Sequence, residues 1–386
     1  MKLNIDETVT PVSLKQRRIP FHIRKKVDEE IDRLLKADII EKIPDSQPTP
    51  WVSPIVAVPQ KDNSIRLCVD MRKPNIAIKR TNFLIPTISD VDVLLNGACY
   101  FSKLDVRQAF HQIELEENSR HITTFTTHRG LFRYKRLNFG TNVASEIFQN
   151  LLEKNLCDIT GAKNIHDDII IFGKTRTEHD LALTRCLKRL AEIGLTLRKN
   201  KCKFLESELS FFGNIYSKAG IHPDPKRIND IVNLPPPSTI REVRSFLGML
   251  NYCSKFFEDF STITKPLRDL TTKHNRFVWT DAHQETFDYL KQKLMSLPVM
   301  AYFDMEKNTQ LCVDASPFGL SAILMQKEKH SNDIRIIAYG SRSLTKVEQK
   351  YSQTEREALA IVWGVEHFHQ YLYGSLFTII TDQFVI

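Results

Sequence analysis

The N-terminal part of the chain changes from helical to strand-like spacing of apolar residues. Over residues 24–37, apolar side chains recur every three or four positions, which predicts an amphipathic helix. Prolines at positions 44, 48, 50 and 54 then exclude a helix and favour extended chain. Within residues 51–69 the runs SPIVAVPQ and IRLCVDM flank a KDNS turn and predict a β-hairpin. The apolar face of the predicted helix consists of Val27, Ile31, Leu34 and Leu35.

Strand and helix signals are mixed between residues 98 and 215. The runs CYFSKLD (99–105) and DIIIF (168–172) predict strands, and residues 144–152 predict a helix. A further helix ends at Gly194, a suitable residue just beyond a helix C-terminus. Because strands and helices do not alternate strictly, the pattern indicates an α+β fold. The apolar face of that further helix is predicted to be Leu183, Leu187, Leu190 and Ile193.

The C-terminal part contains a linker and then a second group of strands. Prolines at 235–237 are typical of a linker, and Thr239 with Glu242 predicts a capping box for the helix that follows. Beyond residue 298 we predict three strands, a long helix over residues 347–372 and a last strand that runs into Asp382. These strands are predicted at 310–315, 320–326, 334–339 and 377–381. With 386 residues the chain is long enough for two or three domains.

Composition narrows the classes of protein that fit. The net charge of +8 suits a polyanionic partner such as nucleic acid. The seven cysteines are scattered without a CxxC pair, which argues against structural zinc or a disulfide framework and favours reduced thiols in an intracellular protein. No apolar run approaches the roughly 18 residues that a membrane span needs, and the N-terminus lacks a signal-peptide pattern. We therefore expect no membrane partner.

Two acidic positions suggest metal-assisted chemistry. Asp105 ends a predicted strand, and Asp167 and Asp168 directly precede another. Phosphoryl transfer to nucleic acid uses two divalent ions, and Mg²⁺ prefers carboxylate oxygens on rigid elements. Because consecutive strand residues point to opposite faces, we expect Asp167 to face Asp105 and Asp168 to play a supporting role. An isolated Asp-Asp pair is more often part of a solvated turn, so the surrounding motifs must decide whether this pair is functional.

Those motifs occur in one order: FSKLDVRQAFHQIEL, LNFGTNVASEIFQ, NIHDDIIIFGKTRTEHD, GLTLRKNKCKF and FFGNIYSKAGI. Together with SPIVAVPQKDNSIRLCVDMRKPN upstream and REVRSFLGMLNYCSKF downstream, they resemble the reverse transcriptase of gypsy-type long-terminal-repeat retrotransposons over essentially the whole chain. The resemblance implies a right-hand polymerase followed by a ribonuclease H-like α/β domain. We expect fingers at 1–95, the palm at 96–222, a thumb or connection at 223–297 and the ribonuclease H-like domain at 298–386.

The resemblance also assigns roles in the polymerase. It implies that Asp105, Asp167 and Asp168 bind two Mg²⁺ ions, with Mn²⁺ as a possible substitute. Phe110 stands where an aromatic ring excludes the ribonucleotide 2′-hydroxyl, and plain core packing is the alternative. The other implied positions are Lys61 and Arg66 at the triphosphate, Phe139 and Gly140 beside the nucleotide, and Lys201 as proton donor to pyrophosphate. Ile165 replaces the family's tyrosine two residues before the Asp pair, which puts efficiency or fidelity in question. His166 is read as a bystander, not as a metal ligand.

A second set of acidic residues resembles a ribonuclease H centre. VDASPFGLSAILMQ, YSQTEREALAIVWGVEHF and TDQF match its opening strands, its helix and its third acidic position. The resemblance implies Asp314, Glu357 and Asp382 as ligands of two further Mg²⁺ ions, if the site forms. Glu355 lies about 200° around the helix from Glu357, so both cannot reach one site. Because the sequence ends where a fourth acidic residue and further elements should follow, we expect a weakly stable module that is poorly active or inactive.

The function expected from these residues is RNA-directed DNA synthesis on a template–primer of RNA or DNA with dNTPs. We expect it inside the cell, in the cytoplasm or in a virus-like particle. One alternative is an inactive or domesticated retroelement fragment that only binds nucleic acid. Another is an RNA-templated RNA polymerase, which would favour a small or polar residue in place of Phe110. The sequence leaves the oligomeric state open.

Overall fold

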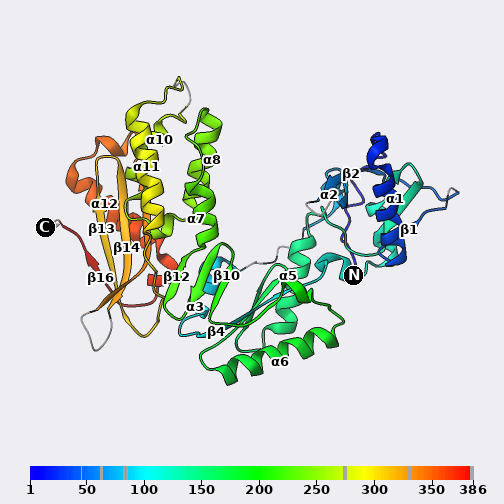
Figure 1. The fold of residues 1–386 in the computed structure, drawn as a ribbon, viewed down its shortest axis with the longest axis horizontal. Helices are drawn as coiled ribbons and strands as arrows, with labels where there is room; N and C mark the ends of the chain where they lie inside the picture. Colours follow the sequence, from blue (N-terminus) through cyan, green and yellow to red (C-terminus); the bar gives the residue numbers. More distant parts are fainter. Residues whose placement is uncertain are drawn as a thin grey trace. The chain divides into compact units, whose positions relative to one another are not determined.

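The chain folds into two compact units in a computed structural model that describes residues 1–44, 46–60, 64–80, 83, 86–272, 276–327 and 333–382 (Figure 1). The first unit comprises Met1–Pro86 and Ser102–Leu205, and the second comprises Thr87–Phe101 and Glu206–Ile386. Helices and strands are mixed in both without regular alternation, which confirms the predicted α+β class. The division into four parts remains a prediction, because these units group residues by contact and not by role.

The N-terminal part of the first unit is a helix packed with a five-stranded sheet. Helix α1 (Phe21–Lys36) begins directly after Pro20, three residues before the predicted start, and buries Val27, Ile31 and Leu34 as the apolar spacing predicts. The strand order is β1 (Ile40–Lys42), β6 (Gly130–Tyr134), β5 (Phe125–Thr127), β2 (Ser53–Pro59) and β3 (Ile65–Val69). Short helices α2 (Pro74–Ala77), α4 (Glu117–Arg120) and η2 (His121–Thr123) connect these elements.

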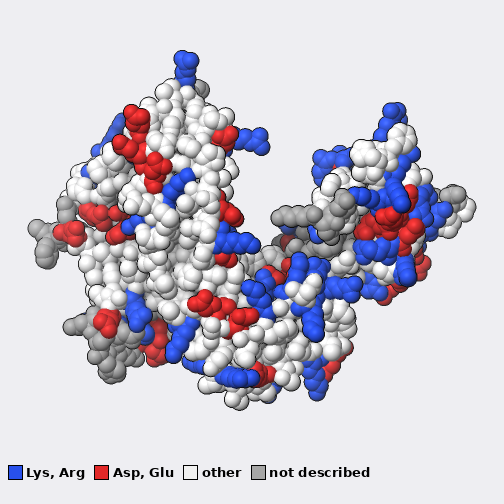
Figure 2. Space-filling view, in the orientation of Figure 1, with Lys and Arg blue, Asp and Glu red and all other residues white. Residues whose placement is uncertain are grey.

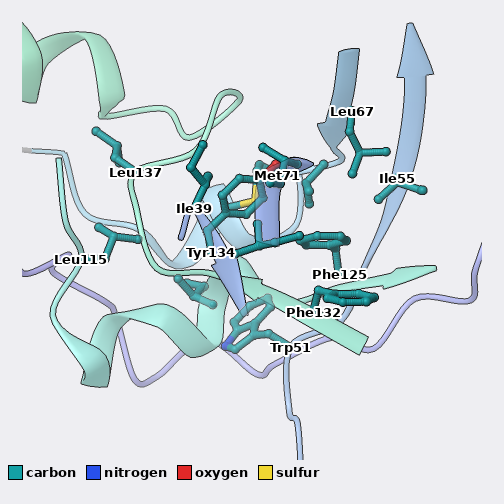
Figure 3. Close-up of a cluster of buried hydrophobic side chains, with 14 of the residues drawn as sticks. Ile39, Trp51, Ile55, Leu67, Met71, Leu115, Phe125, Phe132, Tyr134 and Leu137 are labelled. Carbon is teal, nitrogen blue, oxygen red and sulfur yellow. The ribbon is translucent and has the colours of Figure 1, made fainter. Parts of the chain in front are cut away.

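The core of this part is dense with large side chains (Figure 3). Phe125 and Phe132 face each other across β5 and β6, and their ring centroids lie 5.9 Å apart. Burying such rings contributes roughly 1.5–3 kcal/mol each relative to exposure. The side chains labelled in the figure are Ile39, Trp51, Ile55, Leu67, Met71, Leu115, Phe125, Phe132, Tyr134 and Leu137.

A second sheet of the first unit carries the Asp-Asp turn. Its order is β7 (Ala162–Ile165), β8 (Asp168–Gly173), β4 (Tyr100–Asp105) and β9 (Lys203–Glu206). Helices α5 (Ala144–Leu156) and α6 (Arg176–Glu192) pack on this sheet, and η1 (Ala109–Gln112) and η3 (Lys199–Lys201) adjoin it.

The buried face of α6 differs from the prediction. Its buried residues are His179, Ala182, Cys186 and Leu190, whereas Leu187 is 37% exposed. Leu183 and Ile193 pack only partly against the core. The predicted face was right for Leu190 and in part for Leu183 and Ile193, and wrong for Leu187; it missed His179, Ala182 and Cys186 because it considered only the large aliphatic side chains. His179 can be buried because its ring is hydrogen-bonded to Ser102 and Asp180, which offsets the cost of burying a polar group.

The second unit begins with a short helix, a three-stranded meander and a helical segment. The buried Asp92 of α3 accepts hydrogen bonds from the Tyr216 hydroxyl (2.7 Å) and the Lys255 ammonium (2.8 Å), which ties α3 to later parts of the chain. The elements are α3 (Ile88–Leu94), β10 (Glu208–Phe211), β11 (Asn214–Ser217), β12 (Gly220–Pro223), α7 (Pro225–Val232), α8 (Ile240–Asn251), η4 (Ser254–Phe256), α9 (Phe260–Ile263), α10 (Lys265–Asp269) and α11 (Asp281–Met295).

The second unit ends in a four-stranded sheet of the order β15-β14-β13-β16, with β13 and β16 parallel and the other pairs antiparallel. The predicted long helix over 347–372 is wrong, because the segment forms three pieces. Ser352 and Glu355 make a capping box that starts the main helix at Gln353, and Phe368 ends it. The elements are β13 (Asn308–Ala315), β14 (Gly319–Lys327), β15 (Ile334–Ser343), η5 (Glu348–Lys350), α12 (Gln353–His367), α13 (His369–Leu372) and β16 (Phe377–Ile380).

Two global features bear on the sequence expectations. The described residues include no helix with the length and apolarity that crossing a membrane requires. Figure 2 shows basic and acidic side chains interspersed on the face in view, so the excess of positive charge does not gather there in one continuous patch.

Candidate active sites

The first candidate site is built around the end of β4 and the turn between β7 and β8. Asp105 is the last residue of β4, which neighbours β8 in the sheet. Ile165 pairs with Asp168, so His166 and Asp167 form a two-residue turn. His166 has left-handed backbone (φ 54°), which is uncommon outside glycine. Its N–H donates to Oε1 of the buried Gln149 (2.7 Å), which holds the turn.

The turn lies directly beside Asp105. The Val106 N–H donates to the Asp167 carbonyl (3.5 Å), and this bond joins the residue after Asp105 to the Asp-Asp turn. Asp167 is exposed, while Asp105 and Asp168 are half-buried. The structure therefore brings the three residues to neighbouring strand ends, as a shared site requires.

Basic side chains face two of these carboxylates. The Lys103 ammonium lies 2.7 Å from Asp168 Oδ2, and the Arg198 guanidinium Nε lies 3.7 Å from Asp105 Oδ1. Within the described part of the chain, no three His, Cys, Asp or Glu side chains gather closely enough to hold a metal ion. The strand ends are adjacent, but the side chains do not form a common ligand set, so the metal-binding assignment stays a prediction.

Lys103 and Arg198 are functional candidates that the sequence reasoning missed. Lys103 precedes Asp105 by two residues, so the period of a strand puts both on one face of β4. The two-residue spacing of Lys103 and Asp105 is visible in the sequence FSKLD (101–105). Arg198 had no such signal, because it comes close through a hydrogen bond from its own N–H to the Asp105 carbonyl (2.9 Å), 93 residues apart in sequence.

The predicted nucleotide-side residues form a contiguous cluster. The rings of Phe110 and Phe139 lie 5.0 Å apart, and Phe110 also contacts Phe148 at 6.1 Å. The guanidinium carbon of Arg66, on β3, lies 5.5 Å from the centre of the Phe139 ring, which is cation–π distance. Arg66 is exposed and Phe139 is half-buried. One exposed cation therefore stands beside two aromatic rings.

Three further predicted residues have different outcomes. Gly140 has φ +93°, and a Cβ there would come within 3.4 Å of the Val69 carbonyl, so glycine suits the position. Lys201 is exposed at the end of η3, whose first turn follows Arg198. Lys61 lies outside the described residues. The roles proposed for all three stay predictions.

His111 is half-buried beside this cluster, and both of its ring nitrogens are shielded from solvent without a hydrogen-bond partner. Its ring stacks on Tyr134 (5.8 Å) and meets the Phe139 ring edge-on (5.0 Å). Burial, and to a smaller extent the positive charges of Arg33, Arg136 and Arg66, lower the pKa of His111 to about 4. His111 is therefore a neutral support for Phe139 at physiological pH.

This depressed pKa predicts a pH dependence of stability. Between pH 6.5 and 4 the unfolded chain binds a proton at His111 that the folded chain does not, so stability falls as the pH falls. Over this pH range the free energy of unfolding of the wild type should fall by up to about 3 kcal/mol more than that of His111→Phe. Urea unfolding at pH 7 and pH 4.5 measures it, and an equal acid loss in both proteins would contradict the assignment.

The second candidate site is built on β13, β16 and α12. Asp314 is exposed near the end of β13. Cys312 pairs with Ile380 across the parallel strands, and continuing that register by two residues places Asp382 opposite Asp314. Glu357 on α12 is only 2% exposed. The structure thus places the three acidic positions that the ribonuclease H resemblance implied on neighbouring elements, although the described side chains do not gather closely enough to form a metal site.

Electrostatics tie these three carboxylates to one another. Burial raises the pKa of Glu357, and the charges of Asp314 and Asp382 add to this shift, whereas interactions with the Gln353 side chain and the Ala315 backbone partly oppose it. Gln353 Nε2 donates to Glu357 Oε1 (2.6 Å), whereas Glu357 Oε2 is buried with no hydrogen-bond partner. An orphaned carboxylate oxygen beside two like charges fits a divalent cation. Glu355 instead caps α12, accepting from the Ser352 N–H at 2.7 Å.

Comparison with known proteins identifies two domains in the chain. The model of the reverse transcriptase (RNA-dependent DNA polymerase) family matches residues 58–216. The model of the RNase H-like domain found in reverse transcriptase matches residues 279–379. The chain belongs to the reverse transcriptase family, with a polymerase domain followed by an RNase H-like domain.

Its relatives are Pol polyproteins of retrotransposons, which confirms the predicted resemblance. The chain is 33% identical over 391 residues to the retrovirus-related Pol polyprotein from transposon 412 of Drosophila melanogaster, covering 99% of the chain and 31% of the relative. It is 31% identical over 365 residues to the Tf2-3 polyprotein of Schizosaccharomyces pombe, covering 92% of the chain and 27% of the relative. The chain thus spans about a third of the length of such relatives.

Solved structures of a foamy viral protease–reverse transcriptase share the fold. One, in complex with double-stranded DNA, matches with a TM-score of 0.88 at 25% identity and covers 100% of this chain and 80% of that one. Another, in complex with an RNA/DNA hybrid, matches with a TM-score of 0.85 at 25% identity and covers 100% of this chain and 52% of that one. The right-hand polymerase fold with an RNase H-like domain is therefore confirmed.

Proposed function

We propose that this chain is an RNA-directed DNA polymerase of a retrotransposon, in which a primer 3′-hydroxyl attacks the α-phosphate of a dNTP and releases pyrophosphate. The observation that carries the proposal is the placement of Asp105, Asp167 and Asp168 at neighbouring strand ends of a chain in the reverse transcriptase family. As part of a Pol polyprotein it would act inside the cell, in the cytoplasm or in a virus-like particle.

The donor set of the first site suits Mg²⁺ or Mn²⁺. Asp105, Asp167 and Asp168 supply only oxygens, which hard cations prefer. Lys103 and Arg198 lie beside two of these carboxylates, which shows that the negative charge of the site attracts cations. When bound, two ions supply activation of the primer hydroxyl and stabilisation of the leaving phosphates. Lys103 and Arg198 would then turn from these carboxylates to phosphate oxygens.

The remaining cluster would position the nucleotide. Arg66 has a planar fork that matches phosphate, and Phe139 holds it from one side. Phe110 would exclude a ribonucleotide, and Gly140 lets the backbone approach the substrate. Lys61 would meet the triphosphate and Lys201 would give a proton to pyrophosphate. These roles rest on the resemblance of the motifs and on the contact of Arg66, Phe139 and Phe110.

Nucleotide choice gives a prediction for Phe110. We expect Phe110→Val to raise incorporation of rNTPs relative to dNTPs at least about tenfold, because the smaller side chain leaves room for a 2′-hydroxyl. Single-nucleotide extension gives the ratio of kcat/KM values. Phe148→Leu is the control, since it loosens the same core without changing the residue at the sugar position. An unchanged ratio in Phe110→Val would refute the steric role.

Primer extension tests the proposed polymerase directly. The wild type should extend a DNA primer on an RNA template with dNTPs and not with NTPs, in the presence of Mg²⁺. Extension with NTPs alone would show an RNA polymerase instead. Binding of the template–primer without any extension would show a chain that only binds nucleic acid.

We also propose that Asp314, Glu357 and Asp382 hold two further divalent ions in the RNase H-like domain. The cleavage of the RNA strand of an RNA–DNA hybrid by this domain, which the sequence predicts to be weak, would then depend on these three residues. The buried, unpartnered Glu357 oxygen supports this assignment. When bound, the ions supply an activated water as nucleophile. Gln353 would keep Glu357 in place by its hydrogen bond.

The proposed partner is a template–primer duplex. Foamy viral relatives of the fold are solved with double-stranded DNA and with an RNA/DNA hybrid, which supports a duplex partner here. The net charge of +8 fits contacts with backbone phosphates, which carry no sequence information. Binding should therefore weaken steeply as salt is raised.

A further inference from the structure

Arg268 of α10 is a half-buried cation without an acidic partner. Its Nη1 donates to the Ser343 hydroxyl (2.8 Å), and its guanidinium carbon lies 5.5 Å from the Phe260 ring centre. No ion pair of Arg268 with a carboxylate occurs in the described ranges of the chain. Burial alone lowers the pKa of Arg268, which is the shift expected of a desolvated cation that no nearby anion compensates.

This arrangement is unusual for a half-buried arginine. A guanidinium has five N–H donors, and removing it from water is costly unless anions or acceptors replace the lost hydration. Arg342, on the strand that carries Ser343, has the usual kind of partner, because it donates two hydrogen bonds of 2.9 Å to the carboxylate of Glu348. Arg268 has no such partner among the described residues, so an anion from outside the protein can take this place.

The surroundings of Arg268 identify the kind of anion. Ser343 pairs with Gly319 in the sheet, and the Phe318 carbonyl accepts from the Leu344 N–H (2.9 Å), so the Phe318 loop adjoins Ser343. Phe318 is 45% exposed, and the Lys265 ammonium lies 4.7 Å from its ring centre. An exposed ring beside cations suits a sugar or base together with its phosphate.

Hydroxyl groups complete this surface. Thr262 and Ser316 lie 3.2 Å apart at the same loop. Lys265 is already paired with Asp269 (2.7 Å), which leaves Arg268 as the main uncompensated charge. Asp314 of the second candidate site precedes Ser316 by two residues on the same strand-to-loop segment.

We propose that Arg268, supported by Ser343 and flanked by Phe318, binds a backbone phosphate of a nucleic-acid strand that passes the RNase H-like sheet. The contact rests on the proposed nucleic-acid partner and adds a site to it. It recognises the phosphate and not the base, because the guanidinium offers a bidentate fork and the ring stacks without sequence preference. Free phosphate lacks the sugar or base that would meet Phe318.

The salt dependence of binding tests the contact. The affinity for an RNA–DNA hybrid is measured by fluorescence anisotropy over a series of salt concentrations for wild type, Arg268→Met and Arg268→Gln. Losing one phosphate contact should lower the slope of log K against log salt by about 0.9. It should also weaken binding several-fold at low salt. Arg335→Met, at an exposed arginine near the start of β15, is the matched control and should leave the slope unchanged.

Thermal unfolding without nucleic acid separates this role from a structural one. Arg268→Met removes the charge of a half-buried side chain that has no counter-ion, and it keeps most of the packing volume. Its Tm should therefore equal that of the wild type or be higher. An unchanged slope in the Arg268 variants, or an equal loss in Arg335→Met, would overturn the proposal. Stabilisation of wild type by inorganic phosphate without a slope change would show a free-anion site instead. Should Arg268→Met not fold, Arg268→Gln decides by the same slope. These readouts need no polymerase activity, so they stand apart from primer extension.

Discussion

Asp167→Asn is expected to lower the rate of DNA synthesis by about 10³-fold or more. A bound ion contributes several kcal/mol of transition-state stabilisation, and roughly each 1.4 kcal/mol changes the rate tenfold. Asp167 is exposed in a turn that Gln149 holds through the neighbouring His166, so losing its charge should not disturb the fold. Single-turnover extension at saturating template–primer measures the effect.

The matched control is Asp158→Asn. Asp158 is an exposed acidic residue of the same unit, and it pairs with Arg189 at 2.9 Å. It should keep full synthesis, because no candidate site residue contacts it within the described residues. Synthesis by Asp167→Asn at more than about a tenth of the wild-type rate would remove this residue from the catalytic set.

Glu357→Gln is expected to abolish cleavage of an RNA–DNA hybrid, by about 10³-fold, without lowering stability. The folded-state pKa of Glu357 is raised, so its ionised form opposes folding, and stability is lost as the pH rises through that pKa. Glutamine resembles the protonated acid and removes this opposition. Cleavage of a labelled hybrid and thermal unfolding at pH 7 give the two readouts.

Glu355→Gln is the control two residues away. Glu355 belongs to the capping box of α12, where the Ser352 N–H and hydroxyl both donate to it. Its loss should lower thermal stability while hybrid cleavage persists, the reverse of the Glu357 result. If Glu355→Gln instead stopped cleavage and Glu357→Gln did not, the two carboxylates would have to exchange roles.

Local patterns predicted those parts of the fold in which one face is buried. The helical spacing of Val27, Ile31 and Leu34 identified the buried face of α1 because side chains of a single helix decide it. The strands around Asp314 were also predicted, within a few residues at each end, from strand-like runs in the sequence. The same spacing was only partly right for α6, where polar His179 takes a core position through its bonds to Ser102 and Asp180.

The candidate sites were predicted only as far as neighbouring residues determine them. The acidic residues themselves stood out by motif, but their partners depend on contacts across long separations. Arg198 lies beside Asp105 because two distant parts of the chain meet there. Whether the Glu357 carboxylate oxygen finds a hydrogen-bond partner depends on how α12 packs on β13. Arg268 gave no signal in the sequence, because what distinguishes it is a missing counter-charge. Whether a charged side chain has a counter-charge is known only once the positions of the neighbouring elements are known.

The most direct test of the polymerase account is a crystal structure of the chain with a template–primer, an incoming dNTP and Mn²⁺. Anomalous scattering then locates the ions independently of the protein. We predict two peaks about 3.5–4 Å apart that share carboxylate oxygens of Asp105 and of the Asp167–Asp168 turn. With the nucleotide bound, peaks only at other positions, or three carboxylates that stay apart from both ions, would contradict the account.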